Sequence, residues 1–214
     1  HDCKIEIDWI DAERLEESSR ELEKLSTYDG ILVPGGFGQR GSEGKISAIS
    51  YAREHSIPFL GLCFGFQLAV VEFARSIGLN KANSTELDPK TPHPLIDILP
   101  EQKTVKELGG TMRLGAHEIR IASGTKAFKI YGSGRIHERH RHRFEVNPKY
   151  IPKLTKHGLK FSGRSIDGRR MEILELPKHP FFLATQFHPE FKSRPGKPSP
   201  VFNSFIKTAM GLKS

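Results

Sequence analysis

The chain has 214 residues, of which 36% are hydrophobic and 27% are charged, with a formal net charge of +8. These values are typical of a globular protein with a sizeable core. No apolar run approaches the roughly 20 residues that span a bilayer, and no basic-then-apolar leader opens the sequence, so we expect no membrane anchor and no secretion. The two cysteines, Cys3 and Cys63, are too few for a disulfide framework, which favours a cytoplasmic location.

The first part of the chain alternates predicted strands with predicted helices. The expected elements are a half-buried strand at 4–9, a helix at 12–25, a strand at 31–33, a glycine-rich loop at 34–41, a helix at 43–55, a buried strand at 57–62 and a helix at 64–77. The spacing of apolar residues carries these assignments, and Asp11 is placed to cap the first helix. This order predicts a parallel sheet with helices on both faces.

The second part of the chain has weaker patterns. We expect a long loop at 78–103, short strands or turns at 111–121 and 127–131, a short helix at 148–157, strands at 159–161, 171–176 and 181–187, and a closing helix at 201–210. The predicted fold class is α/β, with a flavodoxin-like, doubly wound, mostly parallel sheet and a few small antiparallel strands. We expect a single domain over residues 1–214.

Cys63 lies between a predicted buried strand and a predicted helix, with Gly61 and Gly65 two residues away on either side. This is the pattern of a nucleophile elbow, the G-x-S-x-G turn, with sulfur in place of the hydroxyl group. Small flanking residues let strand and helix approach closely, and the free N–H groups at the helix start stabilise a thiolate. The alternative is a buried core cysteine, the common state of a free thiol.

A histidine and a glutamate follow another predicted strand. His188 and Glu190 flank Pro189, and because side chains alternate along a strand, the two point to the same side. Strand ends of a parallel sheet meet at one edge, so His188 is placed to reach the thiol of Cys63 and Glu190 to orient the imidazole. The alternative is a surface histidine beside a surface glutamate.

The glycine-rich loop matches G-x-G-x-x-G at 36–41, the fingerprint of dinucleotide binding. That function requires an acidic residue at the end of the next strand, where the chain has Leu62 and Cys63 instead. The glycines of this loop more readily serve to expose backbone N–H groups at the edge of the sheet. We expect the N–H of Gly36 or a neighbour, together with that of Phe64, to form an oxyanion hole.

Residues 135–143 form a dense basic run. Its histidines lack cysteine partners and lie among arginines that repel a cation, so we expect no metal site. Single-stranded nucleic acid is disfavoured because the run contains no interleaved aromatic residues, although Phe144 follows it. An arginine that binds a carboxylate substrate or an anionic effector fits the run equally well.

Three segments together resemble the class I glutamine amidotransferase family: PGGFG at 34–38, GLCFGFQ at 61–67 and QFHPE at 186–190. Three more resemble the amidotransferase domain found in CTP synthases: GQRGSEGK at 38–45, ANSTE at 82–86 and ERHRHRFEVN at 138–147. The resemblance covers almost the whole chain. The first strand and helix of that domain, and the N-terminal synthetase domain, are not in this sequence, which therefore resembles a piece of a longer protein.

The resemblance implies that the chain hydrolyses glutamine through a γ-glutamyl thioester. It implies catalytic roles for Cys63, His188 and Glu190 and an oxyanion hole at Gly36 and Phe64. The residues expected to bind glutamine are Gly36, Phe37, Gln67, Glu86, Arg143 and Phe144. The opposite charges of Glu86 and Arg143 suit the two ends of an amino acid, which supports this assignment independently.

The resemblance also implies partners outside this chain. The loop around Arg40 and Gly41 is similar to a lid through which GTP activates the family, and ammonia would pass to a synthetase domain that aminates UTP. We expect no cofactor in this domain, with ATP and Mg²⁺ required only by the synthetase domain. The alternative function is a catalytically silent regulatory domain that binds an anion or nucleic acid through Arg135–Arg143.

Overall fold

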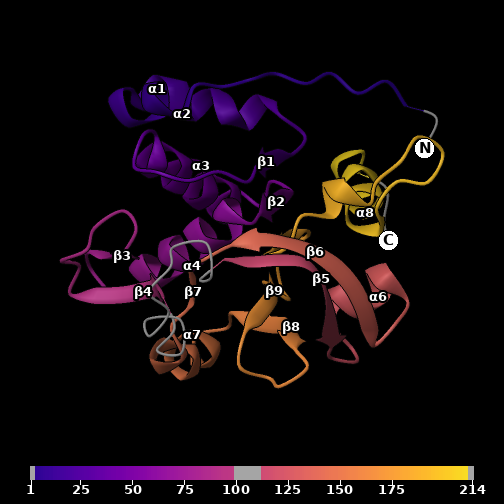
Figure 1. Ribbon diagram of the computed structural model, residues 1–214. Helices are drawn as coiled ribbons and strands as arrows, with labels where there is room; N and C mark the ends of the chain where they lie inside the picture. Colours follow the sequence, from indigo (N-terminus) through magenta and orange to yellow (C-terminus); the bar gives the residue numbers. More distant parts are fainter. Residues whose placement is uncertain (1–2, 99–111, 212–214) are drawn as a thin grey trace.

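The computed structural model of the chain describes residues 3–98 and 112–211, which build a central sheet with helices on both sides (Figure 1). The seven-stranded sheet has the order β1-β2-β10-β9-β8-β5-β6. Its strands are β1 (Ile31–Val33), β2 (Phe59–Leu62), β5 (Arg113–Ile121), β6 (Arg135–His142), β8 (Lys160–Ser165), β9 (Met171–Glu175) and β10 (Phe182–Thr185). A second, three-stranded sheet contains β3 (Ala82–Ser84), β4 (His93–Asp97) and β7 (Glu145–Val146).

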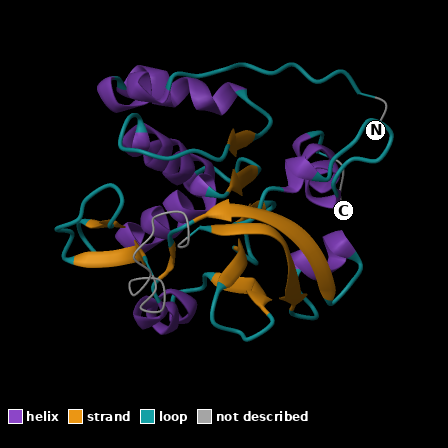
Figure 2. Cartoon of the chain, in the orientation of Figure 1, coloured by secondary structure: helices purple, strands orange, loops and turns teal. Residues whose placement is uncertain are grey.

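The helices lie mainly around the β1-β2-β10 part of the large sheet (Figure 2). They are α1 (Ala12–Glu17), α2 (Ser19–Glu23), η1 (Lys24–Thr27), α3 (Ser42–Glu54), α4 (Phe64–Ser76), α6 (Lys126–Tyr131), η3 (Pro148–Tyr150), α7 (Ile151–Lys156), η4 (Pro189–Phe191) and α8 (Pro200–Ala209). None of these described helices has the length and apolar character needed to cross a lipid bilayer.

Both faces of the central strands are buried, because alternate residues enter two separate cores. Phe59 and Phe182, with ring centroids 4.6 Å apart, lie in the core beneath α3 and α4. Leu60 and Leu183 point the other way, into the core that includes Val201 of α8. A strand buried on both faces has a continuous apolar sequence, which is why 57–62 and 181–187 were recognisable as strands.

The α/β class with helices on both faces is confirmed, and the sheet is mixed. Among the described strands of the seven-stranded sheet, only β1, β2 and β10 pair in parallel, whereas β10-β9, β9-β8, β8-β5 and β5-β6 are all antiparallel. The antiparallel part is therefore larger than the few small strands that the sequence indicated. Much of it is the long, curved ribbon of β5 and β6, which Figure 1 shows extending away from the parallel strands.

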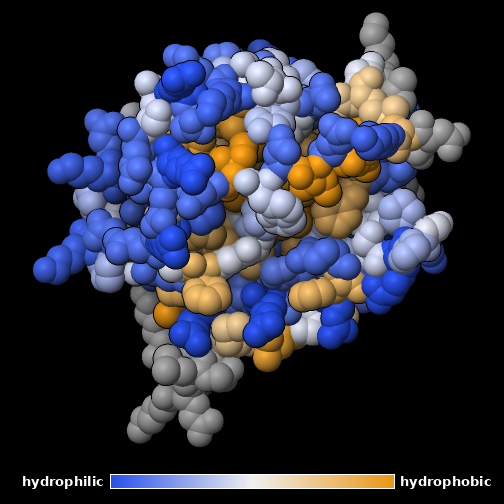
Figure 3. Space-filling view, turned by 90° about the horizontal axis from the view of Figure 1, so that it is seen from above, coloured by the Kyte–Doolittle hydropathy of each residue, from blue (hydrophilic) through white to orange (hydrophobic). Residues whose placement is uncertain are grey.

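The predicted half-buried strand at 4–9 is wrong. In the structure this segment is extended but forms no ladder with any described strand, and its apolar side chains are exposed, Trp9 by 89%. Alternation predicts a strand only if a neighbour supplies the other half of the hydrogen bonds. Seen from above, apolar patches reach the surface between hydrophilic side chains (Figure 3).

Three other assignments need correction. The helix predicted at 12–25 is interrupted at Ser18, which leaves helical geometry and caps α2 through its side chain. Residues 127–131 are helical because Thr125 caps α6, accepting a hydrogen bond from the N–H of Phe128. The loop predicted at 78–103 contains β3 and β4, while 99–103 and residue 111 lie outside the described residues.

The contact between α4 and β1 leaves no room for a side chain at Gly65. A Cβ atom there would lie 2.2 Å from the carbonyl oxygen of Val33. We therefore predict that Gly65→Ala lowers the free energy of unfolding by at least about 3 kcal/mol, measured by urea denaturation. Gly134→Ala is the matched control, since its Cβ would meet nothing closer than 3.8 Å. Equal stability of the two variants would contradict the packing argument.

Candidate active site

Cys63 occupies a strained turn between β2 and α4. Its backbone angles are φ 49° and ψ −95°, in the positive-φ region that side chains other than glycine rarely adopt. The turn is held by two backbone hydrogen bonds: the Cys63 N–H donates to Thr185 O at 2.7 Å, and the Gln67 N–H donates to Cys63 O at 3.1 Å. Strain of this kind, about 1–3 kcal/mol, persists only where the surroundings enforce it. The predicted elbow is present.

The imidazole of His188 lies beside Cys63, and Gly35 packs against both. A Cβ atom added to Gly35 would be 2.8 Å from Cε1 of His188 and 3.7 Å from Cβ of Cys63. The loop after β1, the end of β2 and the segment after β10 therefore meet at one point. This is the sheet edge at which the sequence placed them, because all three strands are parallel.

His188 is polarised from two sides. Its Nδ1 lies 2.6 Å from Oε1 of Glu190, and its Nε2, which has no conventional hydrogen-bond partner in the described part of the chain, is left for the thiol of Cys63. Burial alone would lower the pKa of His188, but the interactions with Cys63 and then Glu190 raise it to about 10. At neutral pH His188 therefore stays protonated beside the thiol.

The backbone of β6 and the residues after it line the other side of the site. Arg139 O accepts from the N–H of His188 at 2.9 Å, and Arg141 O lies 3.9 Å from Cys63 Sγ. Phe144 O accepts from Nε2 of Gln67 at 3.1 Å. The basic run thus takes part in the site mainly through its carbonyl oxygens, a role that side-chain patterns do not reveal.

Alternate side chains of β6 point in opposite directions, so the basic run is not one continuous patch. Arg135, Arg139 and Arg141 are exposed, while Glu138, His140 and His142 are buried. Among the described residues no cluster of three or more metal-ligating side chains could hold an ion.

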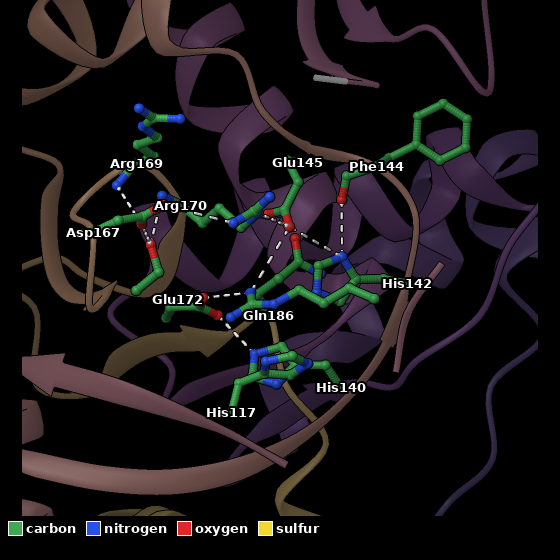
Figure 4. A network of polar contacts seen from close by, with 12 residues as sticks. His117, His140, His142, Phe144, Glu145, Asp167, Arg169, Arg170, Glu172 and Gln186 are labelled. Atoms are coloured by element: carbon green, nitrogen blue, oxygen red, sulfur yellow. Dashed lines mark hydrogen bonds and ion pairs between the residues drawn. The ribbon is translucent and has the colours of Figure 1, made fainter. Parts of the chain in front are cut away.

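A buried network of ion pairs fixes β6 to β9 (Figure 4). Glu172 of β9 pairs with His140 at 2.8 Å and with Arg113 of β5, and Arg113 also lies 3.8 Å from Glu145. Burial alone would raise the pKa of Glu172, but hydrogen bonds from His140 and Arg113 lower it to about 2. The network therefore anchors the strand that supplies the carbonyl groups around Cys63.

Comparison with known proteins identifies the family. The family model described as "Glutamine amidotransferase class-I" matches residues 1–208. The chain belongs to the class-I glutamine amidotransferases. It is 63% identical over 209 residues to a CTP synthase of Archaeoglobus fulgidus and 58% identical over 215 residues to one of Pyrococcus abyssi. These matches cover 97% and 100% of this chain but only 39% and 40% of the relatives' lengths.

A solved structure supports the same family. The chain is similar to the glutaminase domain of Trypanosoma brucei CTPS with bound acivicin, with a TM-score of 0.94 and 38% sequence identity. The match covers 99% of this chain and 83% of that one. The fold described above is therefore that of an amidotransferase domain.

The other predicted site residues of this amidotransferase differ in their contacts, and Gly36, Phe37 and Glu86 all belong to or touch the glycine-rich loop. A Cβ on Gly36 would lie 3.6 Å from the ring of Phe64, so the two expected oxyanion donors are neighbours in space. The side chain of Phe37 is 87% exposed. Glu86 accepts a hydrogen bond from the N–H of Gly38 at 3.2 Å, which brings it to the glycine-rich loop.

The remaining predicted residues lie directly after β6 and directly before α3. Arg143 and Phe144 are half-buried and directly follow β6. Arg40 pairs with Glu13 of α1 at 2.8 Å, and Gly41 at φ 65° packs against the same helix. The role of these two residues in an effector lid stays a prediction.

Sequence reasoning missed Gln186. This fully buried residue donates from Nε2 to Cys63 Sγ at 3.8 Å and accepts from Nε2 of Gln67 at 3.4 Å. A signal was available, because a buried amide directly after an apolar strand requires polar partners. The strand alternation expected at 188 and 190 is not the cause of their placement, since β10 ends at Thr185 and Glu190 lies in η4.

An ion pair connects Lys192, which directly follows η4 with its Glu190, to β6. Lys192 Nζ lies 3.9 Å from Glu138, whose side chain is buried and whose pKa burial raises to about 7, against the opposing effect of Lys192. A carboxyl with a raised pKa binds its proton more tightly in the folded state. The stability that this tighter proton binding gives the folded state is therefore lost as the pH rises from about 4.5 to about 7.

We predict that Glu138→Gln raises the free energy of unfolding by about 1–3 kcal/mol at pH 8 and has little effect near pH 4.5. Urea denaturation across this range measures the difference from wild type. Glu118→Gln, on the neighbouring strand β5, serves as the control and should show no such pH dependence. A Glu138→Gln variant that is less stable than wild type at pH 8 would contradict the assignment.

Proposed function

We propose that this domain is the glutaminase part of a CTP synthase and hydrolyses L-glutamine to glutamate and ammonia. The observation that carries the proposal is the strained Cys63 at the elbow, with His188 beside it and Glu190 2.6 Å from the other imidazole nitrogen. The family membership gives this arrangement its substrate class, the side-chain amide of glutamine.

In the first half of the reaction, the thiolate of Cys63 attacks the amide carbon of glutamine, and the carbonyl π electrons move to oxygen. The N–H groups of Gly36 (or Phe37) and Phe64 stabilise this oxyanion; the latter N–H has no acceptor within α4 because it starts the helix. Protonated His188 then donates its Nε2 proton to the departing nitrogen. The C–N bond breaks, ammonia leaves, and a γ-glutamyl thioester remains on Cys63.

In the second half, neutral His188 takes a proton from water as the water oxygen attacks the thioester carbon. The C–S bond breaks, glutamate leaves, and the thiolate–imidazolium pair is restored. Glu190 keeps the imidazole in the orientation that presents Nε2 to sulfur and stabilises its positive charge throughout.

Residues near the mouth of the site recognise the amino-acid end of glutamine. In our proposal Glu86 binds the α-ammonium group and Arg143 the α-carboxylate, since their charges are opposite to those of the two groups. Gln67 in α4, Phe37 and Phe144 complete the pocket. Glu86 is already held toward the loop by its hydrogen bond with Gly38.

The wider role rests on the relatives, which are CTP synthases of which this chain spans about two-fifths. We propose that residues 1–214 belong to one glutaminase domain, and that its ammonia aminates UTP on a synthetase domain in the cytoplasm. ATP and Mg²⁺ would serve that synthetase domain, and GTP would act as an activator through the loop at Arg40 and Gly41.

Cys63→Ala should lower ammonia release from glutamine by at least about 1,000-fold, because the nucleophile is lost. Enzyme-coupled detection of ammonia measures this loss. Cys3→Ala is the matched control, since Cys3 lies in the extended N-terminal segment, and it should retain the wild-type rate. Mass spectrometry after treatment with acivicin should find an adduct on Cys63. Undiminished ammonia release by Cys63→Ala would refute the proposed function.

Glu86→Gln should raise the KM for glutamine about 10- to 100-fold, the effect of losing one charge-assisted hydrogen bond, with a much smaller change in kcat. Steady-state kinetics separates the two constants. Glu54→Gln, an exposed position at the end of α3, is the control for loss of a negative charge. An unchanged KM in Glu86→Gln would exclude the assigned contact with the ammonium group.

A further inference from the structure

We infer that Gln186 holds the sulfur of Cys63 in its reactive, deprotonated form by donating an amide N–H to it, and that it couples this contact to the glutamine-binding residue Gln67. The inference rests on the proposed role of Cys63 as the nucleophile. It adds to the group of Cys63, His188 and Glu190 a further side chain, which lies against the sulfur itself.

The backbone of Gln186 is fixed by the sheet. The residue directly follows β10, which pairs with β9 in antiparallel register, and its own N–H donates to Glu172 O at 2.9 Å. Glu172 is in turn held through its carboxylate by His140 and Arg113, as Figure 4 shows for the histidine. The backbone of Gln186 is therefore anchored to β9, and its side chain is completely buried.

The orientation of the Gln186 amide follows from its neighbours. Phe144 O can only accept a hydrogen bond, so the group of Gln67 that lies 3.1 Å from it is the NH₂. The same NH₂ lies 3.4 Å from the Gln186 amide, which must present its oxygen there. The nitrogen of Gln186 consequently points to Cys63 Sγ, 3.8 Å away.

This donor distinguishes the two protonation states of the thiol. In the neutral state the S–H can donate to Arg141 O, 3.9 Å from the sulfur. In the thiolate state that carbonyl offers nothing, whereas the N–H of Gln186 and protonated His188 both stabilise the anion. Hydrogen bonds to a charged group gain strength in a buried site, and the sulfur-bearing residue is only 5% exposed.

The test measures alkylation of Cys63 by iodoacetamide as a function of pH, with the modified peptide resolved by mass spectrometry from that of Cys3. Gln186→Met has nearly the same shape and no donor, and Gln186→Leu is a second apolar replacement in case one variant does not fold. Thr185→Val is the matched control, because it removes a neighbouring buried hydrogen bond, from Thr185 Oγ1 to Phe187 O, without touching the sulfur.

We expect the midpoint pH of alkylation to rise by about one unit in the Gln186 variants, which is a tenfold smaller thiolate fraction below the midpoint, and to stay unchanged in Thr185→Val. The KM for glutamine should also rise in the Gln186 variants, since Gln67 loses an acceptor. An unchanged midpoint in folded Gln186 variants overturns the inference. Alkylation needs no glutamine turnover, so absence of glutaminase activity in the wild type would count against the proposed function and not against this role.

Discussion

The active site depends on the close contact between the start of α4 and the backbone of β1. Gly65 packs so tightly against the carbonyl of Val33 that no side chain fits, and a Cβ atom on Gly61 would lie 2.8 Å from the carbonyl oxygen of Gly65. This contact brings the helix start over the end of β2 and forces Cys63 into a positive-φ conformation. The thiol is thereby presented at the edge of the sheet, in front of the first N–H groups of the helix, where an anion is favoured.

The second requirement is a fixed wall opposite the elbow. Among the described strands, the β5–β6 ribbon joins the rest of the sheet through the pairing of β5 with β8, so its position relative to Cys63 needs additional support. The buried pairs of Glu172 with His140 and Arg113 supply it. An ion network of this kind does not have to add stability in order to specify a unique arrangement. Here it determines where the carbonyl groups of Arg139 and Arg141 stand.

Local chemistry explains which parts of the site were recognisable from the sequence. The elbow and the segment at 188–190 follow apolar strands that are buried on both faces, and parallel strand ends converge at one edge whatever the details of the fold. Residues 82–86 and 135–143 lack such patterns. Their strands are short or bear charges on both faces, and their partners lie far away in the chain, so periodicity could assign neither the small sheet nor the ribbon.

The sequence by itself determined the α/β class, the elbow at Cys63, the position of His188 after a neighbouring strand, and the family. These features could be predicted because each depends on a short segment whose composition favours one local geometry. Only the tertiary structure decided the mixed direction of the sheet, the unpaired state of residues 4–9 and the burial of alternate residues of β6. It also placed Gln186 against the sulfur of Cys63. That contact joins residues 123 positions apart in the chain, and a buried amide in a sequence does not reveal which distant atom it will bind.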